Sequence, residues 1–124
     1  MRTLILTMVL STMLGGCATT AENTYVAQSS HYMNATWYMH GTKTANGEKF
    51  NPNGLTAAHK TLPFGTILRV TNPDNGRSIV VRVNDRGPFT KGLDLDISRG
   101  GAQQLGFIKK GRTKLFVENL KPSR

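Results

Sequence analysis

A valine-rich run that ends in an acidic residue and a rigid turn constrains this chain most strongly. Residues 80–89 read VVRVNDRGPF. The alternating, β-branched start of the run predicts a β-strand, and Gly87-Pro88 predicts its end. Asp85 is therefore expected at a junction of strand and loop, where a rigid scaffold can direct a carboxyl group into a cleft. The alternative is that Asp85 only caps the backbone of its own turn.

Two further segments carry groups that could act together with this carboxyl group. Residues 44–50, TANGEKF, contain Glu48, and residues 55–59, LTAAH, contain His59. Taken alone, His59 is more simply interpreted as a hydrogen-bonded histidine of the core. A second carboxylate and an imidazole are thus available, but their position relative to Asp85 depends on the fold.

Short alternating segments separated by turn residues extend over most of the chain, as is typical of a small β-barrel. Asn75-Gly76 predicts a hairpin turn, because this pair accepts positive φ. The expected strands are residues 35–39, 55–58, 66–71, 78–84, 93–97 and 113–120.

One short helix is expected between the last two strands. Ser98 is its predicted N-cap, Leu105 its last residue and Gly106 its stop. The helix is weak by propensity, because Gly100 and Gly101 each cost about 1 kcal/mol relative to alanine. It therefore needs support from the barrel.

Together, the motifs TANGExF, LTAAHKTLPFGT, VVRVNDRGPF and the later DIS resemble the RlpA (rare lipoprotein A) family, whose members are septal lytic transglycosylases acting on peptidoglycan. The resemblance covers residues 35–120 and depends on separated motifs in the right order. It implies a mainly β fold, a six-stranded double-psi β-barrel with one or two short helices. This barrel is related to those of expansins and family 45 endoglucanases.

The resemblance also implies a set of catalytic residues. The catalytic Asp of the family falls on Asp85, which would act as general acid and then as base. Glu48 matches the cleft Glu, which would add negative charge near Asp85 or stabilise a transition state that resembles an oxocarbenium ion. His59 matches the family's His and is expected to position Asp85 through a hydrogen bond.

Other candidates would bind substrate. Tyr38 and Trp37 are interpreted as one cleft ring and one core ring, with their assignment left open. Arg86 could bind a stem-peptide carboxylate or hinder proton donation by Asp85. Asp96 is expected to line the cleft or to cap structure. Neither a metal nor a cofactor is expected, because the His, Asp and Glu residues lack metal-ligand spacing.

The start of the chain resembles the signal peptide of a bacterial lipoprotein. Arg2 precedes an apolar stretch over residues 4–14, which is shorter than the roughly 20 residues of a membrane-spanning helix. The sequence LGGC then ends at Cys17, the one cysteine of the chain. We expect lipid attachment at Cys17. The alternative is a plain secretory signal that leaves Cys17 as a free thiol or removes it.

These features divide the chain into three parts. Residues 1–16 are the expected signal peptide, residues 17–33 a lipid-anchored flexible tether, and residues 34–124 the barrel domain. The tether assignment depends on small, polar residues without a period. Ala18 after the cysteine favours, by resemblance to Gram-negative sorting, the periplasmic face of the outer membrane.

Charge points to a polyanionic partner in the cell envelope. Loss of residues 1–16 leaves 108 residues with 15 Lys and Arg against 7 Asp and Glu, a net charge of +8. An exported protein seldom meets nucleic acid, so peptidoglycan glycan strands, with their stem-peptide carboxylates, are the expected partner. The alternative is a basic surface that only confers solubility. A monomer is expected.

Two classes of function remain open. The first is an endolytic lytic transglycosylase that cleaves the MurNAc-β-1,4-GlcNAc bond and leaves a 1,6-anhydromuramic end. The second is a non-catalytic, expansin-like lipoprotein that binds peptidoglycan. Hydrolysis with inversion is a smaller third possibility, because the separation of the two carboxyl groups would decide how water enters.

Overall fold

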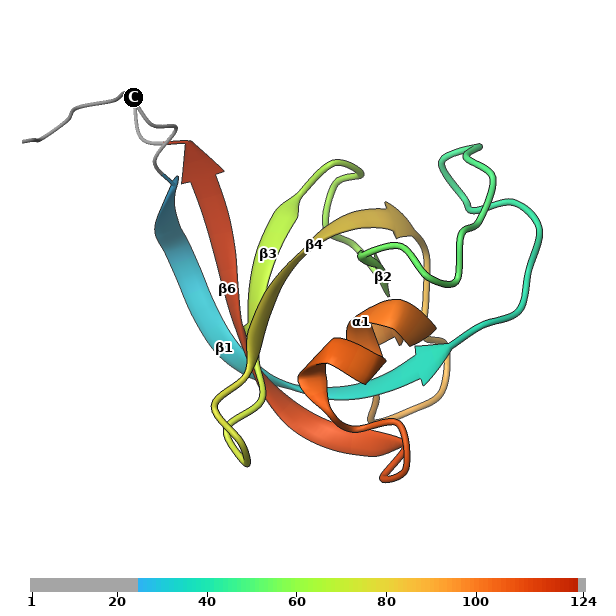
Figure 1. The fold of residues 1–124 in the computed structure, drawn as a ribbon. Helices are drawn as coiled ribbons and strands as arrows, with labels where there is room; N and C mark the ends of the chain where they lie inside the picture. The colour runs from blue at the N-terminus through green and yellow to red at the C-terminus, as the bar shows by residue number, and fades with distance from the viewer. Residues whose placement is uncertain (1–24, 123–124) are drawn as a thin grey trace, which may run out of the picture.

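The computed structural model describes residues 25–122, which form six strands and one helix (Figure 1). The strands close into a barrel in the order β1-β5-β2-β4-β3-β6. The predicted mainly β, six-stranded barrel with a short helix is therefore confirmed. The elements are β1 (Tyr25–Tyr38), β2 (Thr56–His59), β3 (Ile67–Thr71), β4 (Ser78–Asp85), β5 (Leu95–Ser98), α1 (Arg99–Leu105) and β6 (Arg112–Pro122).

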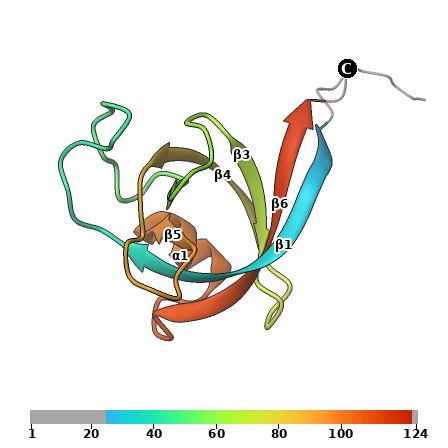
Figure 2. The ribbon, with the colours of Figure 1, turned by 180° about the vertical axis from the view of Figure 1, so that it is seen from behind.

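The barrel is a mixed sheet with a small apolar core. β1 pairs with β5 and β2 with β4 in parallel, whereas the remaining neighbours are antiparallel. Alternate strand residues point inward, and α1 packs against the barrel with Ala102 and Leu105 buried. Figure 2 shows α1 and β5 close to the C-terminal part of β1. The core therefore consists of one side-chain layer from each strand and one face of the helix.

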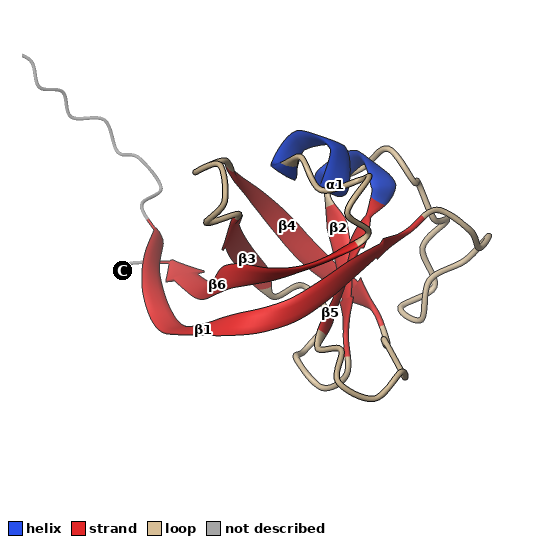
Figure 3. Cartoon of the chain, turned by 90° about the horizontal axis from the view of Figure 1, so that it is seen from below, coloured by secondary structure: helices blue, strands red, loops and turns tan. Residues whose placement is uncertain are grey.

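The first strand is longer than the sequence predicts. Residues 25–33, assigned to the flexible tether, form the N-terminal part of β1 and pair with β6 from Tyr25 onward. Figure 3 shows the two strands running side by side over this length. Local sequence misses the strand because its residues are mostly exposed and its stability comes from the ladder with β6. The rest of the tether, the signal peptide and Cys17 lie outside the described residues.

The other predicted elements are in place with small shifts. β5 begins at Leu95 instead of residue 93, and the Asp94 N–H just before the strand donates to the carbonyl of Asn34 on β1 at 2.9 Å. Ser98 caps α1 by accepting a hydrogen bond from the Gly101 N–H, and Gly106 ends it in the left-handed conformation. No helix within residues 25–122 is both long and apolar enough to cross a membrane.

The two helical glycines have a packing reason. A Cβ atom on Gly100 would lie 2.6 Å from the backbone oxygen of Asn53, and one on Gly101 would lie 2.6 Å from Cγ2 of Ile97. Both distances are far below van der Waals contact, so the helix can approach the barrel only without these side chains. Close packing therefore offsets the poor helix propensity of glycine at this site.

Gly100→Ala is expected to lower the free energy of unfolding by about 1–3 kcal/mol, the usual cost of overpacking. Helix propensity alone would instead give a gain of about 1 kcal/mol. Urea unfolding followed by circular dichroism distinguishes the two. Gln103→Ala, on the exposed side of the same helix, is the matched control and should change little. A stabilised Gly100→Ala variant would contradict the packing explanation.

Candidate functional site

Strand register brings two carboxyl groups to the same face of the barrel. The Cα of Ala58 on β2 pairs with Asp85 on β4 and with Asp96 on β5. Asp96 pairs in turn with Thr36 on β1. Because Leu95 and the other flanking β5 residues point into the core, Asp96 points outward. The two acids thus flank β2 at one level on the outside of the sheet.

Asp85 is held by three hydrogen-bond donors. Its Oδ1 accepts from the backbone N–H of Ala45 at 2.8 Å and from that of Arg86 at 2.9 Å. Its Oδ2 accepts from the hydroxyl of Tyr38 at 3.2 Å. The bond from Arg86 is the local turn contact that a purely structural Asp would make. The other two donors come from segments about 40 residues away and aim the carboxyl group.

The two aromatic candidates at the end of β1 have different surroundings. Tyr38 stacks on Phe50 with ring centroids 4.8 Å apart and reaches Asp85 with its hydroxyl. Burial, followed by the charge of Asp85, raises the pKa of Tyr38, so the phenol stays protonated and donates. Trp37 packs against the core and donates from Nε1 to the carbonyl of Ile108 at 3.1 Å. Tyr38 is therefore the ring beside the carboxyl groups.

Asp96 lies half-buried on the outside of the sheet. Burial raises its pKa, and the nearby charge of Asp85 acts in the same direction. The hydroxyl of Thr36, which donates to Oδ1 at 3.0 Å, opposes this effect. A carboxyl group in this position therefore holds a proton more readily than a free aspartate does.

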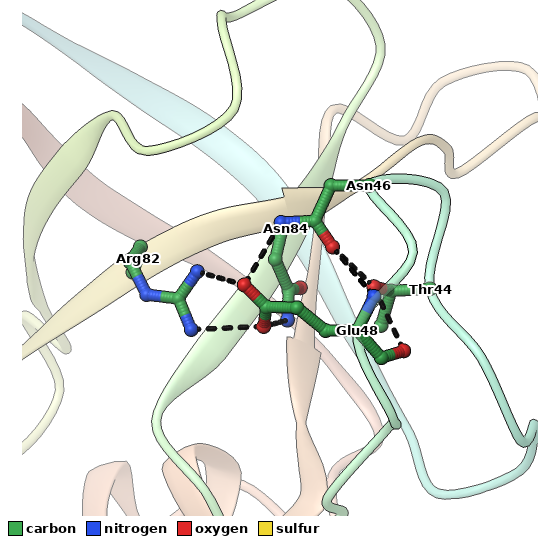
Figure 4. Close-up of polar contacts among 5 residues, drawn as sticks. All are labelled: Thr44, Asn46, Glu48, Arg82 and Asn84. Carbon is green, nitrogen blue, oxygen red and sulfur yellow. Dashed lines mark hydrogen bonds and ion pairs between the residues drawn. The ribbon is translucent and has the colours of Figure 1, made fainter.

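Glu48 forms a separate network, which we call the clasp and which consists of Glu48, Arg82, Asn84 and Asn46 (Figure 4). Arg82 binds the Glu48 carboxylate with both terminal nitrogens, at 2.7 and 2.9 Å. The side-chain amides of Asn84 and Asn46 donate to the same carboxylate at 3.0 and 2.9 Å. These bonds, that from Arg82 foremost, lower the pKa of Glu48 to about 2. Glu48 is a fixed anion at neutral pH.

The clasp holds the loop over residues 44–50 against β4. The Asn46 N–H donates to the Asn84 carbonyl at 3.3 Å, and the Thr44 N–H donates to the Glu48 carbonyl at 2.8 Å. Ala45 lies between these anchored residues, and its N–H points to Asp85. The clasp thus places a donor on Asp85 without Glu48 itself touching that carboxyl group.

His59 does not make the hydrogen bond to Asp85 that the sequence predicts. Its Nδ1 accepts from the backbone N–H groups of Thr61 and Leu62, each at 3.1 Å. Within residues 25–122 no hydrogen bond joins the His59 ring to Asp85. The reason is strand alternation: Ala58 lies between the two outward acids, so the next residue on β2 points to the other face.

Arg86 holds the loop after β2. Its Nη1 donates to the carbonyls of His59 at 3.2 Å and Leu62 at 2.9 Å. Its guanidinium also stacks over the ring of Phe64, 4.0 Å from the centroid. These contacts occupy one terminal nitrogen and one planar face of the group, so Arg86 is mainly a positioning residue and less available for a stem-peptide carboxylate.

Two exposed aromatic rings were not predicted from the sequence as site residues. Phe64 is 41% exposed and Phe89 is 83% exposed. Phe89 follows the Gly-Pro turn that ends β4, and its ring approaches Gly87. Phe64 follows Pro63 and Phe89 follows Pro88, where no core strand was expected. A large apolar ring directly after a turn was the signal that could have identified both residues. Within residues 25–122, no three His, Cys, Asp or Glu side chains are arranged to hold a metal ion.

Residues 30–117 match the family described as "Lytic transglycolase". The chain belongs to this family, with the RlpA proteins. It is 46% identical over 102 residues to "Endolytic peptidoglycan transglycosylase RlpA" of Neisseria meningitidis serogroup A, covering 80% of this chain and 43% of the relative. It is 53% identical over 87 residues to the protein of that name from Campylobacter jejuni, covering 68% and 32%. The chain therefore spans less than half the length of these relatives.

Solved structures show the same barrel in more distant proteins. An expansin of Clavibacter michiganensis superimposes with a TM-score of 0.59 at 19% identity, covering 77% of this chain and 51% of the expansin. A Streptomyces papain inhibitor gives a TM-score of 0.62 at 20% identity, covering 76% and 96%. These likenesses concern the fold alone.

The clasp predicts a defined pH dependence of stability. The pKa of Glu48 falls from 4.5 to about 2 on folding, so its stabilising effect is complete above pH 4.5 and is lost as the pH falls toward 2. The difference in unfolding free energy between the native protein and Glu48→Gln should therefore shrink below that pH. Urea unfolding at pH values of about 7, 4 and 2.5 measures it.

A double-mutant cycle supplies the control for this experiment. In an Arg82→Gln background the main partner of Glu48 is gone, so the effect of Glu48→Gln should be smaller and should vary less with pH. A difference that stays constant from neutral pH to about 2.5 in the native background would contradict the assigned role of the ion pair.

Proposed function

We propose that this chain is an endolytic peptidoglycan transglycosylase, which cleaves the MurNAc-β-1,4-GlcNAc bond and leaves a 1,6-anhydromuramic end. The observation that carries the proposal is the pair of outward carboxyl groups, Asp85 and Asp96, on either side of Ala58. The names of the relatives, endolytic peptidoglycan transglycosylases, support the same reaction. Cleavage of a glycosidic bond needs one group that donates a proton and one that accepts it.

We assign the two roles from the surroundings of each carboxyl group. Asp96, whose pKa burial raises, donates its proton to the departing glycosidic oxygen. Asp85, with donors on both oxygens, accepts the proton of the muramic C6 hydroxyl as that oxygen attacks the anomeric carbon. The C–O bond to the leaving sugar breaks as the anhydro bond forms. The proton gained by Asp85 then returns to Asp96 through solvent.

The neighbouring residues keep this arrangement in place. Tyr38 remains a protonated phenol and donates to Oδ2 of Asp85. This bond fixes the direction of the remaining lone pairs on the Asp85 carboxyl group. Glu48 is too acidic to donate a proton at neutral pH, so we assign it the role of a fixed charge that holds the Ala45 loop. The family resemblance implied both proton steps for Asp85, whereas the second carboxyl group lets Asp96 take the donating step.

A non-catalytic role in binding peptidoglycan is the second candidate. Two observations favour it: His59 is separate from the acids, and a related barrel, the Clavibacter expansin, has been solved in complex with cellohexaose. In that case the surface around Tyr38 would hold a glycan without cutting it. The products of digestion distinguish the two candidates.

We infer a place of action in the cell envelope, with a lipid anchor on Cys17 and the barrel at the periplasmic face of the outer membrane. The LGGC sequence that ends at Cys17 and the excess of basic residues support this location. Residues 25–33 of the expected tether belong to β1. A monomer with peptidoglycan glycan strands as its partner, and without nucleic acid, fits this placement.

Asp85→Asn is expected to reduce the release of anhydromuramic ends at least about 100-fold, because the variant loses its proton acceptor. Asp96→Asn should give a loss of similar size. The purified protein is incubated with peptidoglycan, with and without amidase pretreatment, and the soluble products are weighed by mass spectrometry. Asp74→Asn, which removes an exposed carboxylate paired with Lys110, is the matched control and should remain active.

Three outcomes would contradict parts of this account. Reducing ends in place of anhydro ends would show hydrolysis. Binding to peptidoglycan without any product would favour the non-catalytic role. Full activity of Asp96→Asn beside an inactive Asp85→Asn would return both proton steps to Asp85 alone.

A further inference from the structure

The structure contains a pocket on the other face of the sheet from the two acids. Its volume is about 330 Å³, and it opens where the N-terminal half of β1 and the adjoining part of β6 meet the end of β2. This volume is at the lower end of the range of small-molecule sites. The pocket has an apolar floor and a polar rim. The floor consists of Met33, Leu62, Leu68 and Val117, and the rim includes Ser29, His31, His59, Asp94 and Asn119.

His59 presents a hydrogen-bond donor to this pocket. Its Nδ1 accepts two backbone N–H groups, so a neutral ring must carry its proton on Nε2. Burial lowers the pKa of His59 and favours this neutral form, although the charge of Asp94 opposes it. Within residues 25–122, Nε2 has no hydrogen-bond partner. The pocket therefore holds a donor that is half-buried and unused.

Asp94 presents an acceptor to the same pocket. Its Oδ2 accepts from the backbone N–H of Asn34 at 3.0 Å, whereas Oδ1 has no partner among the described residues. No ion pair within 4.0 Å joins Asp94 to His59 in this part of the chain. A donor and an acceptor thus belong to two residues that line the same pocket above an apolar floor.

We propose that this pocket binds the acetamido group of an N-acetylated amino sugar. The carbonyl oxygen of the group accepts from Nε2 of His59, its N–H donates to Asp94, and its methyl group lies on the apolar floor. A plain glucan has a hydroxyl group at that carbon, which would leave the apolar floor uncovered. The choice of ligand rests on the proposed function, since peptidoglycan consists of such sugars.

Arg86 links the pocket to the face of the sheet that carries Asp85. Arg86, directly after Asp85, donates to the carbonyl of His59 at the rim of the pocket and to that of Leu62 in its floor. A sugar bound at this rim is therefore held in a fixed position relative to the end of β4, which carries Asp85. This gives His59 a role in substrate binding in place of the predicted hydrogen bond to the acid.

Ser29→Trp tests the proposal by filling the pocket. Ser29 is exposed on β1 and lines the pocket, so a large ring there blocks it without removing a core contact. Ser30→Trp is the matched control, because Ser30 is also exposed and points to the opposite side of the strand. Asp94→Asn is a second variant, which can keep the bond from Asn34 but offers an amide donor in place of the free acceptor.

Binding of triacetylchitotriose and of cellotriose, which differ in the acetamido group, is measured by isothermal titration calorimetry. The native protein should bind triacetylchitotriose at least about tenfold more tightly than cellotriose. Ser29→Trp and Asp94→Asn should each weaken triacetylchitotriose binding at least about tenfold, and Ser30→Trp should not. Equal affinity for the two trisaccharides, or binding that Ser29→Trp leaves unchanged, would overturn the proposal.

A parallel digestion of peptidoglycan separates this proposal from the proposed function. If the native protein releases anhydromuramic ends but Ser29→Trp binds triacetylchitotriose as the native protein does, the pocket proposal fails and the transglycosylase stands. If no anhydro ends appear but the binding pattern holds, the pocket proposal stands and the protein is a binding module.

Discussion

The ion pair between Glu48 and Arg82 is the contact on which the arrangement of the site depends. It joins the loop over residues 44–50 to a strand of the barrel by two short bonds, and two asparagine amides complete the carboxylate's partners. Thr44 and Phe50 bury the two ends of this loop, and the ion pair attaches the stretch between them to β4. Through this attachment the N–H of Ala45 reaches Asp85. The ion pair of Glu48 thereby determines which backbone donor the Asp85 carboxyl group meets.

The second organising feature is the alternation of side chains along β2. Its two last residues point to opposite faces: Ala58 leaves room on the outside between Asp85 and Asp96, and His59 faces the pocket on the inside. One short strand thus separates a pair of acids suited to bond cleavage from a donor suited to binding. Arg86 ties the two faces together through the loop after the strand. A shift of β2 by one residue would move each of its side chains to the opposite face, so that His59 would lie on the side of the two acids.

Sequence patterns located the elements wherever local signals are strong. The valine-rich run gave β4 and the position of Asp85 at its end, and Ser98 with Gly106 bounded the helix. They missed what depends on distant partners. Residues 25–33 have no apolar period and form a strand only because β6 lies beside them. The contacts of Glu48 and His59 could not be predicted either. Those of Glu48 depend on an arginine 34 residues away, and those of His59 depend on which face of β2 its side chain occupies. Motif membership identified these residues without revealing their neighbours.

Hydrogen exchange at the Ala45 amide, followed residue by residue by NMR, tests most directly whether the ion pair positions a donor on Asp85. In the native protein the Ala45 N–H should be protected although its residue is exposed, because the Asp85 carboxylate accepts from it. In Arg82→Gln this protection should disappear while that of the Arg86 N–H, which is a local contact, persists. An Ala45 amide that exchanges freely in the native protein, or one whose protection survives Arg82→Gln, would contradict the account.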